Sequence, residues 1–82
     1  MKTTKKDVIW EVWEINRLFM LNDIPMCVWV QYEYEFKKCY DIVFAQKWVN
    51  ERVRRIWCAS IREMLKYLLW YKEWLKLLVK NK

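Results

Sequence analysis

The sequence of 82 residues contains no glycine and no histidine, one proline (Pro25) and one serine (Ser60). Without glycine there is no glycine-rich loop to hold a phosphate, and no residue that easily adopts the positive φ of tight turns. Helices need few such turns, so this absence favours a helical fold. Without histidine the chain lacks the commonest general base and metal ligand. We therefore expect no enzymatic activity, no cofactor and no metal site.

Long apolar runs and paired cysteines are also missing. The longest run without a charged residue, Ile24 to Tyr32, has nine residues, whereas a membrane-spanning helix needs about 20. The N-terminus lacks the apolar segment of a signal peptide, so we expect a cytoplasmic protein. The cysteines, Cys27, Cys39 and Cys58, are odd in number and fit no disulfide framework or metal motif. We expect them to be reduced packing residues.

Hydrophobic and basic residues are abundant. The chain is 56% hydrophobic and contains seven tryptophans, which predicts a packed core in one small domain spanning residues 1–82. Its net charge is +6, and this charge is unevenly distributed. Residues 1–46 hold six basic and seven acidic side chains, whereas residues 47–82 hold ten and three. Such a basic C-terminal half can indicate an acidic partner, nucleic acid or an anionic membrane.

The first half predicts one clear helix and one ambiguous segment. Thr4 and Asp7 have the spacing of a capping box, and apolar residues follow at helical intervals, so we expect a helix over residues 4–22. The next stretch, VWVQYEYEFK, alternates like a strand, but its apolar residues also fall within an arc of about 120° on a helix. Because the KKC that follows contains no turn former, we predict a helix over residues 24–47. The alternative is a β-hairpin between residues 27 and 46.

The C-terminal part predicts a long helix over residues 50–80, with Asn50 as its cap. A heptad seam runs through it with intervals of three and four; it comprises Val53, Trp57, Ser60, Met64, Tyr67, Tyr71, Trp74 and Leu78. The predicted fold is therefore all-α, a three-helix bundle with a long C-terminal helix. The alternative fold is α+β, with a helix, a β-hairpin and a long helix in that order.

The other side of this long helix carries the predicted binding residues. Cations recur along it at Arg52, Arg55, Arg62, Lys66, Lys76 and Lys80. Leu69, Trp70 and Leu77 lie among them and cannot face the same core as the seam, so we interpret them as a hydrophobic anchor. The polar rim of this predicted partner-binding site comprises Arg62, Lys66, Glu73, Lys76 and Lys80.

These residues predict a small protein that binds other proteins stoichiometrically, as a regulator, adaptor or inhibitor does. We expect it to self-associate through its long C-terminal helix, as a homodimer or a higher oligomer. One alternative is nucleic-acid binding through the basic face of residues 52–80. A second alternative is binding to a membrane surface through the basic amphipathic C-terminal helix, whose sequence ends WYKEWLKLLVKNK.

Overall fold

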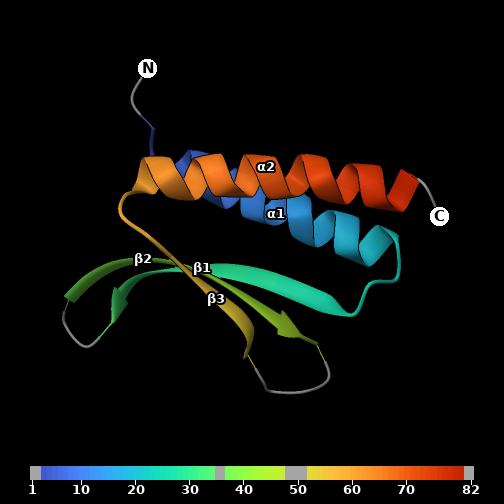
Figure 1. The fold of residues 1–82 in the computed structure, drawn as a ribbon, viewed down its shortest axis with the longest axis horizontal. Helices are drawn as coiled ribbons and strands as arrows, with labels where there is room; N and C mark the ends of the chain where they lie inside the picture. Colours follow the sequence, from blue (N-terminus) through green and yellow to red (C-terminus); the bar gives the residue numbers. More distant parts are fainter. Residues whose placement is uncertain (1–2, 35–36, 48–51, 81–82) are drawn as a thin grey trace.

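The structure, a computed structural model, describes residues 3–34, 37–47 and 52–80. Along the chain it contains helix α1 (Lys5–Leu21), strands β1 (Met26–Tyr34), β2 (Lys37–Gln46) and β3 (Arg52–Cys58), and helix α2 (Ile61–Lys80) (Figure 1). The fold is therefore α+β. The prediction of an all-α three-helix bundle is wrong, as is the coiled-coil interpretation of its seam, and the alternative α+β interpretation fits.

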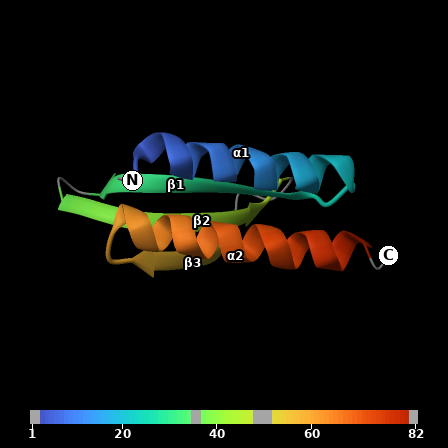
Figure 2. The same ribbon diagram turned by 90° about the horizontal axis from the view of Figure 1, so that it is seen from above.

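The three strands form one antiparallel sheet in the order β1-β2-β3. Both helices lie on the same face of this sheet, side by side and running in the same direction (Figures 1 and 2). Seen from above, α1 lies beside β1, and α2 lies on the β3 side (Figure 2). The core fills the space between the layers and comprises Val8, Ile15, Phe19, Val28, Ile42, Phe44, Cys58, Met64, Leu68 and Leu75.

Helix α1 begins close to the predicted position and is followed by a turn without glycine. The predicted capping box is present, and the backbone N–H of Thr4 donates to the Asp7 carboxylate at 2.9 Å. After the helix, Asp23 adopts a φ of 55°, a conformation that Asp tolerates better than most residues. β1 then begins at Met26. The helix predicted to begin at residue 24 therefore does not form there.

The segment predicted as a second helix forms β1 and β2 instead. Its period of two places Val28, Val30 and Tyr32 on the side of the helices, where they contact the core. β2 lies between two neighbours, and each residue from Asp41 to Ala45 is buried. The helices cover Ile42 and Phe44 on one face. On the other face the side chains of β2 lie between those of their partners in β1 and β3, as Val43 does between Trp29 and Arg55.

The predicted third helix is divided into a strand and a helix. Residues 52–58 pair with β2, and the helix begins at Ile61. Ser60 Oγ accepts a hydrogen bond from the Glu63 N–H at 3.2 Å, and the Ala59 N–H donates to the Glu63 carboxylate at 2.7 Å. Ser60 therefore caps the helix, and the Glu63 carboxylate binds the backbone one residue before the cap, so that both bonds fix the start of α2. Asn50, the predicted cap, lies outside the described residues.

Candidate protein-binding surface

The three predicted anchor residues all lie on α2 and are partly exposed. The exposed fractions are 42% for Leu69, 60% for Trp70 and 63% for Leu77. At 100° per residue, Trp70 and Leu77 lie about 20° apart around the helix, whereas Leu69 lies about 100° from Trp70. The structure thus brings two of the three together, and Leu69 lies apart on the side that faces α1.

Two residues assigned to the buried seam extend the surface of Trp70 and Leu77. Trp74 is 44% exposed and Leu78 is 47% exposed, and both lie within about 100° of Leu77 around the helix. We call Trp70, Trp74, Leu77 and Leu78 the α2 apolar edge. Sequence reasoning missed Trp74 and Leu78 because it oriented the helix wrongly. The side chains of α2 that are fully buried are Met64, Leu68 and Leu75.

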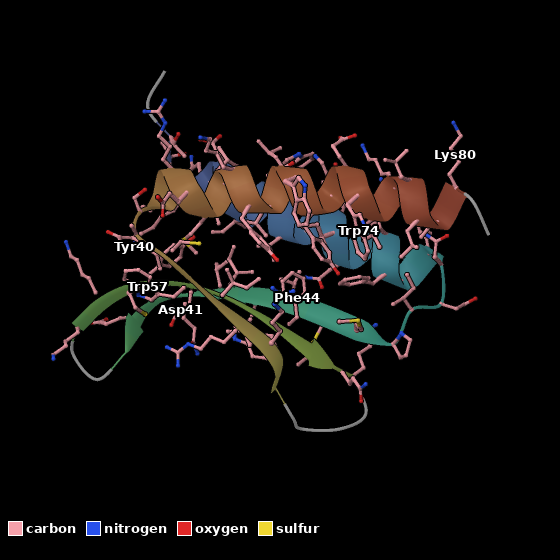
Figure 3. All side chains as sticks on the ribbon, viewed as in Figure 1. Tyr40, Asp41, Phe44, Trp57, Trp74 and Lys80 are labelled. Atoms are coloured by element: carbon pink, nitrogen blue, oxygen red, sulfur yellow. The ribbon has the colours of Figure 1, made fainter. Side chains whose placement is uncertain are left out.

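Two tyrosines connect the α2 apolar edge to the core. The ring centroids of Tyr67 and Trp70 are 5.6 Å apart, and those of Tyr71 and Trp74 are 5.3 Å apart. Tyr71 also packs on Phe44 of β2 at 4.6 Å; Trp74 and Phe44 are labelled in Figure 3. The exposed tryptophan rings therefore rest on half-buried aromatic rings, which restricts the rotamers that the tryptophans can adopt.

Burial and one arginine of β3 influence the pKa of the two tyrosines beneath Trp70 and Trp74. Burial raises the pKa of the Tyr67 and Tyr71 hydroxyl groups, while the positive charge of Arg54 acts in the opposite direction. Both hydroxyls therefore stay neutral at physiological pH.

The predicted polar rim flanks the α2 apolar edge on one side. All its members are exposed and lie within about 80° of one another on the side of α2 nearer to α1; they are Arg62, Lys66, Glu73, Lys76 and Lys80. Lys76 and Glu73 form a surface ion pair at 3.7 Å. On its other side the edge overlooks β3, which carries Arg54.

The continuous basic face predicted for residues 52–80 is divided between elements. Arg52 and Arg55 belong to β3 and not to the helix, and the side chain of Arg52 lies outside the described residues. Arg55 donates through Nε to Asp41 Oδ2 at 2.8 Å, and its Nη2 also contacts this oxygen. Asp41 is fully buried and points from β2 away from the helices, opposite to Tyr40 (Figure 3). The arginines of β3 are also separated from one another, because successive residues of a strand point to opposite faces of the sheet, as Arg54 and Arg55 do.

A second buried ion pair joins the helices. Lys72 of α2 donates to both carboxylate oxygens of Glu11 in α1, at 2.8 Å for Oε2. The side chains of Lys72 and Glu11 are 15% and 5% exposed. The Glu11 carboxylate therefore holds α1 against α2.

Exposed apolar side chains also occur on α1 and on the sheet, where the sequence had indicated no site. Trp10 and Trp13 stack at 5.5 Å between ring centroids, and with Lys6 and Ile9 they line a shallow hollow. Trp57 of β3, assigned to the buried seam, is 74% exposed. These α1 residues were missed because the apolar residues of that segment were used only to predict a helix.

The acidic and cysteine side chains of the described residues are distributed over several helices and strands. Within residues 3–34, 37–47 and 52–80, no three acidic or cysteine side chains gather where they could hold a metal ion. The three cysteines are free thiols, and Cys58 is buried. Burial raises the pKa of the Cys39 and Cys58 thiols, so both are protonated at neutral pH and are weak nucleophiles.

Two further observations bear on the choice of function. Neither α1 nor α2, as far as the structure describes them, combines the length and the apolar character needed to cross a bilayer. Comparison of the chain with protein-family models, with curated proteins and with solved structures gives no match.

Proposed function

We propose that this protein acts by stoichiometric binding of other proteins, as a regulator, adaptor or inhibitor, and that its own second copy is its first partner. The α2 apolar edge carries this proposal. Tryptophan is enriched among residues that dominate binding energy, above all where apolar neighbours surround it. Here two tryptophans and two leucines, each between 44% and 63% exposed, occupy one side of one helix.

The exposed area suits a contact between copies. A tryptophan buries roughly 150–250 Å² when fully covered, and about half of Trp70 and Trp74 remains exposed. In a symmetric dimer these four rings alone offer on the order of 400 Å². A specific interface buries about 1,200–2,000 Å² in total, so the two leucines and the flanking side chains have to supply the rest.

The support beneath the tryptophans lowers the cost of binding. Trp70 contacts Tyr67, and Trp74 contacts Tyr71, which itself packs on the core residue Phe44. Ordering a flexible side chain on association costs about 0.5–1.5 kcal/mol. Because the tryptophan side chains are already ordered in the folded protein, association costs less conformational entropy.

As part of the same proposal we place the protein in the cytoplasm, where its three free thiols stay reduced.

The first test is the molar mass in solution, measured by light scattering after size exclusion with reductant and without detergent. We expect a dimer or a higher oligomer. Trp70→Ala should weaken self-association roughly tenfold or more while the helix content is unchanged. Trp10→Ala on α1 is the matched control, because Trp10 is 58% exposed and Trp70 is 60% exposed. A wild-type monomer at every concentration would contradict self-association, and helicity lost in Trp70→Ala would show that this ring supports the core.

Salt separates this proposal from its nucleic-acid alternative. Two copies with a net charge of +6 repel each other, so self-association should strengthen as salt screens this repulsion. Nucleic-acid binding, favoured by the cations on one side of α2, should weaken steeply with salt. A gel shift at low salt that disappears near physiological salt, in a protein that stays monomeric, would favour the nucleic-acid function.

A further inference from the structure

The outer face of α1 combines apolar and cationic side chains without a carboxylate. Six residues lie within about 100° of one another around the helix, on the side turned away from the core. We call them the α1 outer face; they are Lys6, Ile9, Trp10, Trp13, Arg17 and Met20. Each is exposed, and the four apolar members are between 53% and 60% exposed.

The charges of α1 are segregated around the helix. Asp7, Glu11 and Glu14 lie together on the side turned toward α2, where Glu11 is neutralised by Lys72. Lys6 and Arg17 lie on the outer face. The two charged side chains of the outer face are therefore both basic, although α1 carries equal numbers of acidic and basic side chains over Lys5–Leu21. Arg17 also forms an ion pair with Glu14 at 4.0 Å, which is weak because both side chains are partly exposed to water.

The two cations lie beside tryptophan rings. The Arg17 guanidinium lies 5.7 Å from the centroid of the Trp13 ring, and Trp13 stacks on Trp10. Lys6 borders the hollow that both rings line. Tryptophan and basic residues together are typical of surfaces at the boundary between water and lipid, where the ring enters the headgroup layer and the cation meets a phosphate or a carboxylate.

The shape of the molecule allows both helices to approach a flat surface. Its principal extents are 40, 34 and 16 Å, and the helices form one broad layer over the sheet (Figure 2). A helix lying parallel to a bilayer presents its whole outer face at once. A face that is about 21 Å long at 1.5 Å per residue, from Lys6 to Met20, can therefore contact several lipid headgroups together.

We propose that the α1 outer face binds the surface of an anionic lipid membrane. Trp10 and Trp13 enter the headgroup region, and Lys6 and Arg17 contact acidic headgroups. The complementary charge selects the occupant, because a zwitterionic surface gives no net attraction to these cations. This inference goes beyond the proposed protein binding, which depends on α2.

The test is co-sedimentation of the full chain with extruded vesicles at near-physiological salt. We expect binding to vesicles of phosphatidylcholine and phosphatidylserine at 3:1, and little binding to phosphatidylcholine alone. Lys6→Gln combined with Arg17→Gln should lower the affinity roughly 30-fold, since each basic residue near an anionic surface contributes about fivefold. Arg62→Gln with Lys66→Gln on α2 removes the same charge from another face and should change the affinity less than threefold, a limit of about 0.6 kcal/mol.

A second pair of variants tests the tryptophans. Trp10→Ala with Trp13→Ala should abolish binding, whereas Trp57→Ala on β3, which removes a tryptophan that is 74% exposed, should leave it intact; circular dichroism of each variant checks that the fold persists. Equal losses in the α1 and α2 charge variants would overturn the site, because they would indicate attraction by net charge alone. Protein that stays in the supernatant with acidic vesicles but binds an acidic peptide such as oligoglutamate would assign this face to a protein partner. Light scattering without lipid reports the α2 contact separately.

Discussion

The ion pair between Glu11 and Lys72 predicts an asymmetric response to mutation. Removing one partner of a fully buried pair costs about 3–5 kcal/mol, because the other charge stays behind without compensation. The Lys72 side chain is 15% exposed and the Glu11 side chain is 5% exposed. Lys72 is also long enough to turn its ammonium group toward water, whereas Glu11 is not.

We therefore expect Lys72→Met to cost more than Glu11→Leu. Lys72→Met leaves the less exposed carboxylate unpaired and should cost about 3 kcal/mol, whereas Glu11→Leu should cost about 1–2 kcal/mol. The double variant replaces both charges by apolar groups of similar volume, so it should be close to the wild type or more stable. A chain of this size has a total stability of about 4–12 kcal/mol, so Lys72→Met removes a large share of it.

Urea unfolding followed by circular dichroism measures all four proteins of this cycle. The matched control is the surface pair of Glu73 and Lys76, whose side chains are 69% and 52% exposed. Removal of either partner there should cost no more than about 0.5 kcal/mol. If Lys72→Met destabilises the protein no more than Lys76→Met does, the helices are not joined by a buried ion pair and the reasoning fails.

Three further predictions concern the edge of the sheet, the start of α2 and the titration of its tyrosines. The Asn16 amide clamps the edge of β1 through two hydrogen bonds of 2.9 Å with the backbone of Val28; Asn16→Ala should cost about 1–2 kcal/mol in urea unfolding and should increase aggregation, and an unchanged midpoint would refute the clamp. Ser60→Ala should cost about 1 kcal/mol in thermal unfolding, because Ser60 accepts from the Glu63 N–H, while an equal loss in Ser60→Gly would argue against capping. Burial raises the pKa of Tyr71 above 10.0, so the unfolded chain releases this proton first and stability should fall as pH rises from about 10. Tyr71→Phe should flatten that fall, and an unchanged pH profile would contradict it.

Helix α1 shows what sequence reasoning could establish. The capping box of Thr4 and Asp7 and the helical spacing of the apolar residues both predicted a helix in the same segment. The observed helix begins at Lys5. The outward side of α1 was missed because the apolar residues were used only to predict a helix, and its two faces were not compared. The observed core side holds Val8, Ile15 and Phe19. A charge criterion would have found the other face, since basic and acidic residues of α1 separate around the helix.

The first two strands could not be separated from a helix by pattern alone. Val28, Tyr32 and Phe36 recur every four residues, which satisfies a helix period of 3.6 and a strand period of two together. Burial decides between them in the folded chain, because Val28 and Phe44 are cross-strand partners in a core that α1 also covers. That pairing joins residues far apart in sequence, so the propensities of the local sequence could not predict it.

Strand β3 is a different case, because a local signal was present and was outweighed. Trp57, Ser60 and Met64 continue the heptad spacing of α2, so the seam was extended backward through residues that are in fact a strand. Ser60 and Glu63 have the spacing of a capping box, which marks a helix start and not its middle. The consequence reached the candidate site, because the extended seam oriented α2 so that Trp74 and Leu78 faced the core. Trp70 and Leu77 were assigned to the surface under either orientation, because they lie opposite Leu68 and Leu75.

The absence of glycine pointed to helices for a reason that the structure shows to be incomplete. Glycine is favoured at positive φ because it has no Cβ, but Asp and Asn reach the same region with a small penalty. Asp23, at a φ of 55°, reverses the chain between α1 and β1. An antiparallel sheet of three strands needs two such reversals of its own, and residues 35–36 and 48–51 lie outside the described part. A composition without glycine therefore limits the number of tight turns. A sheet of three strands needs only a few turns, so the lack of glycine does not exclude it.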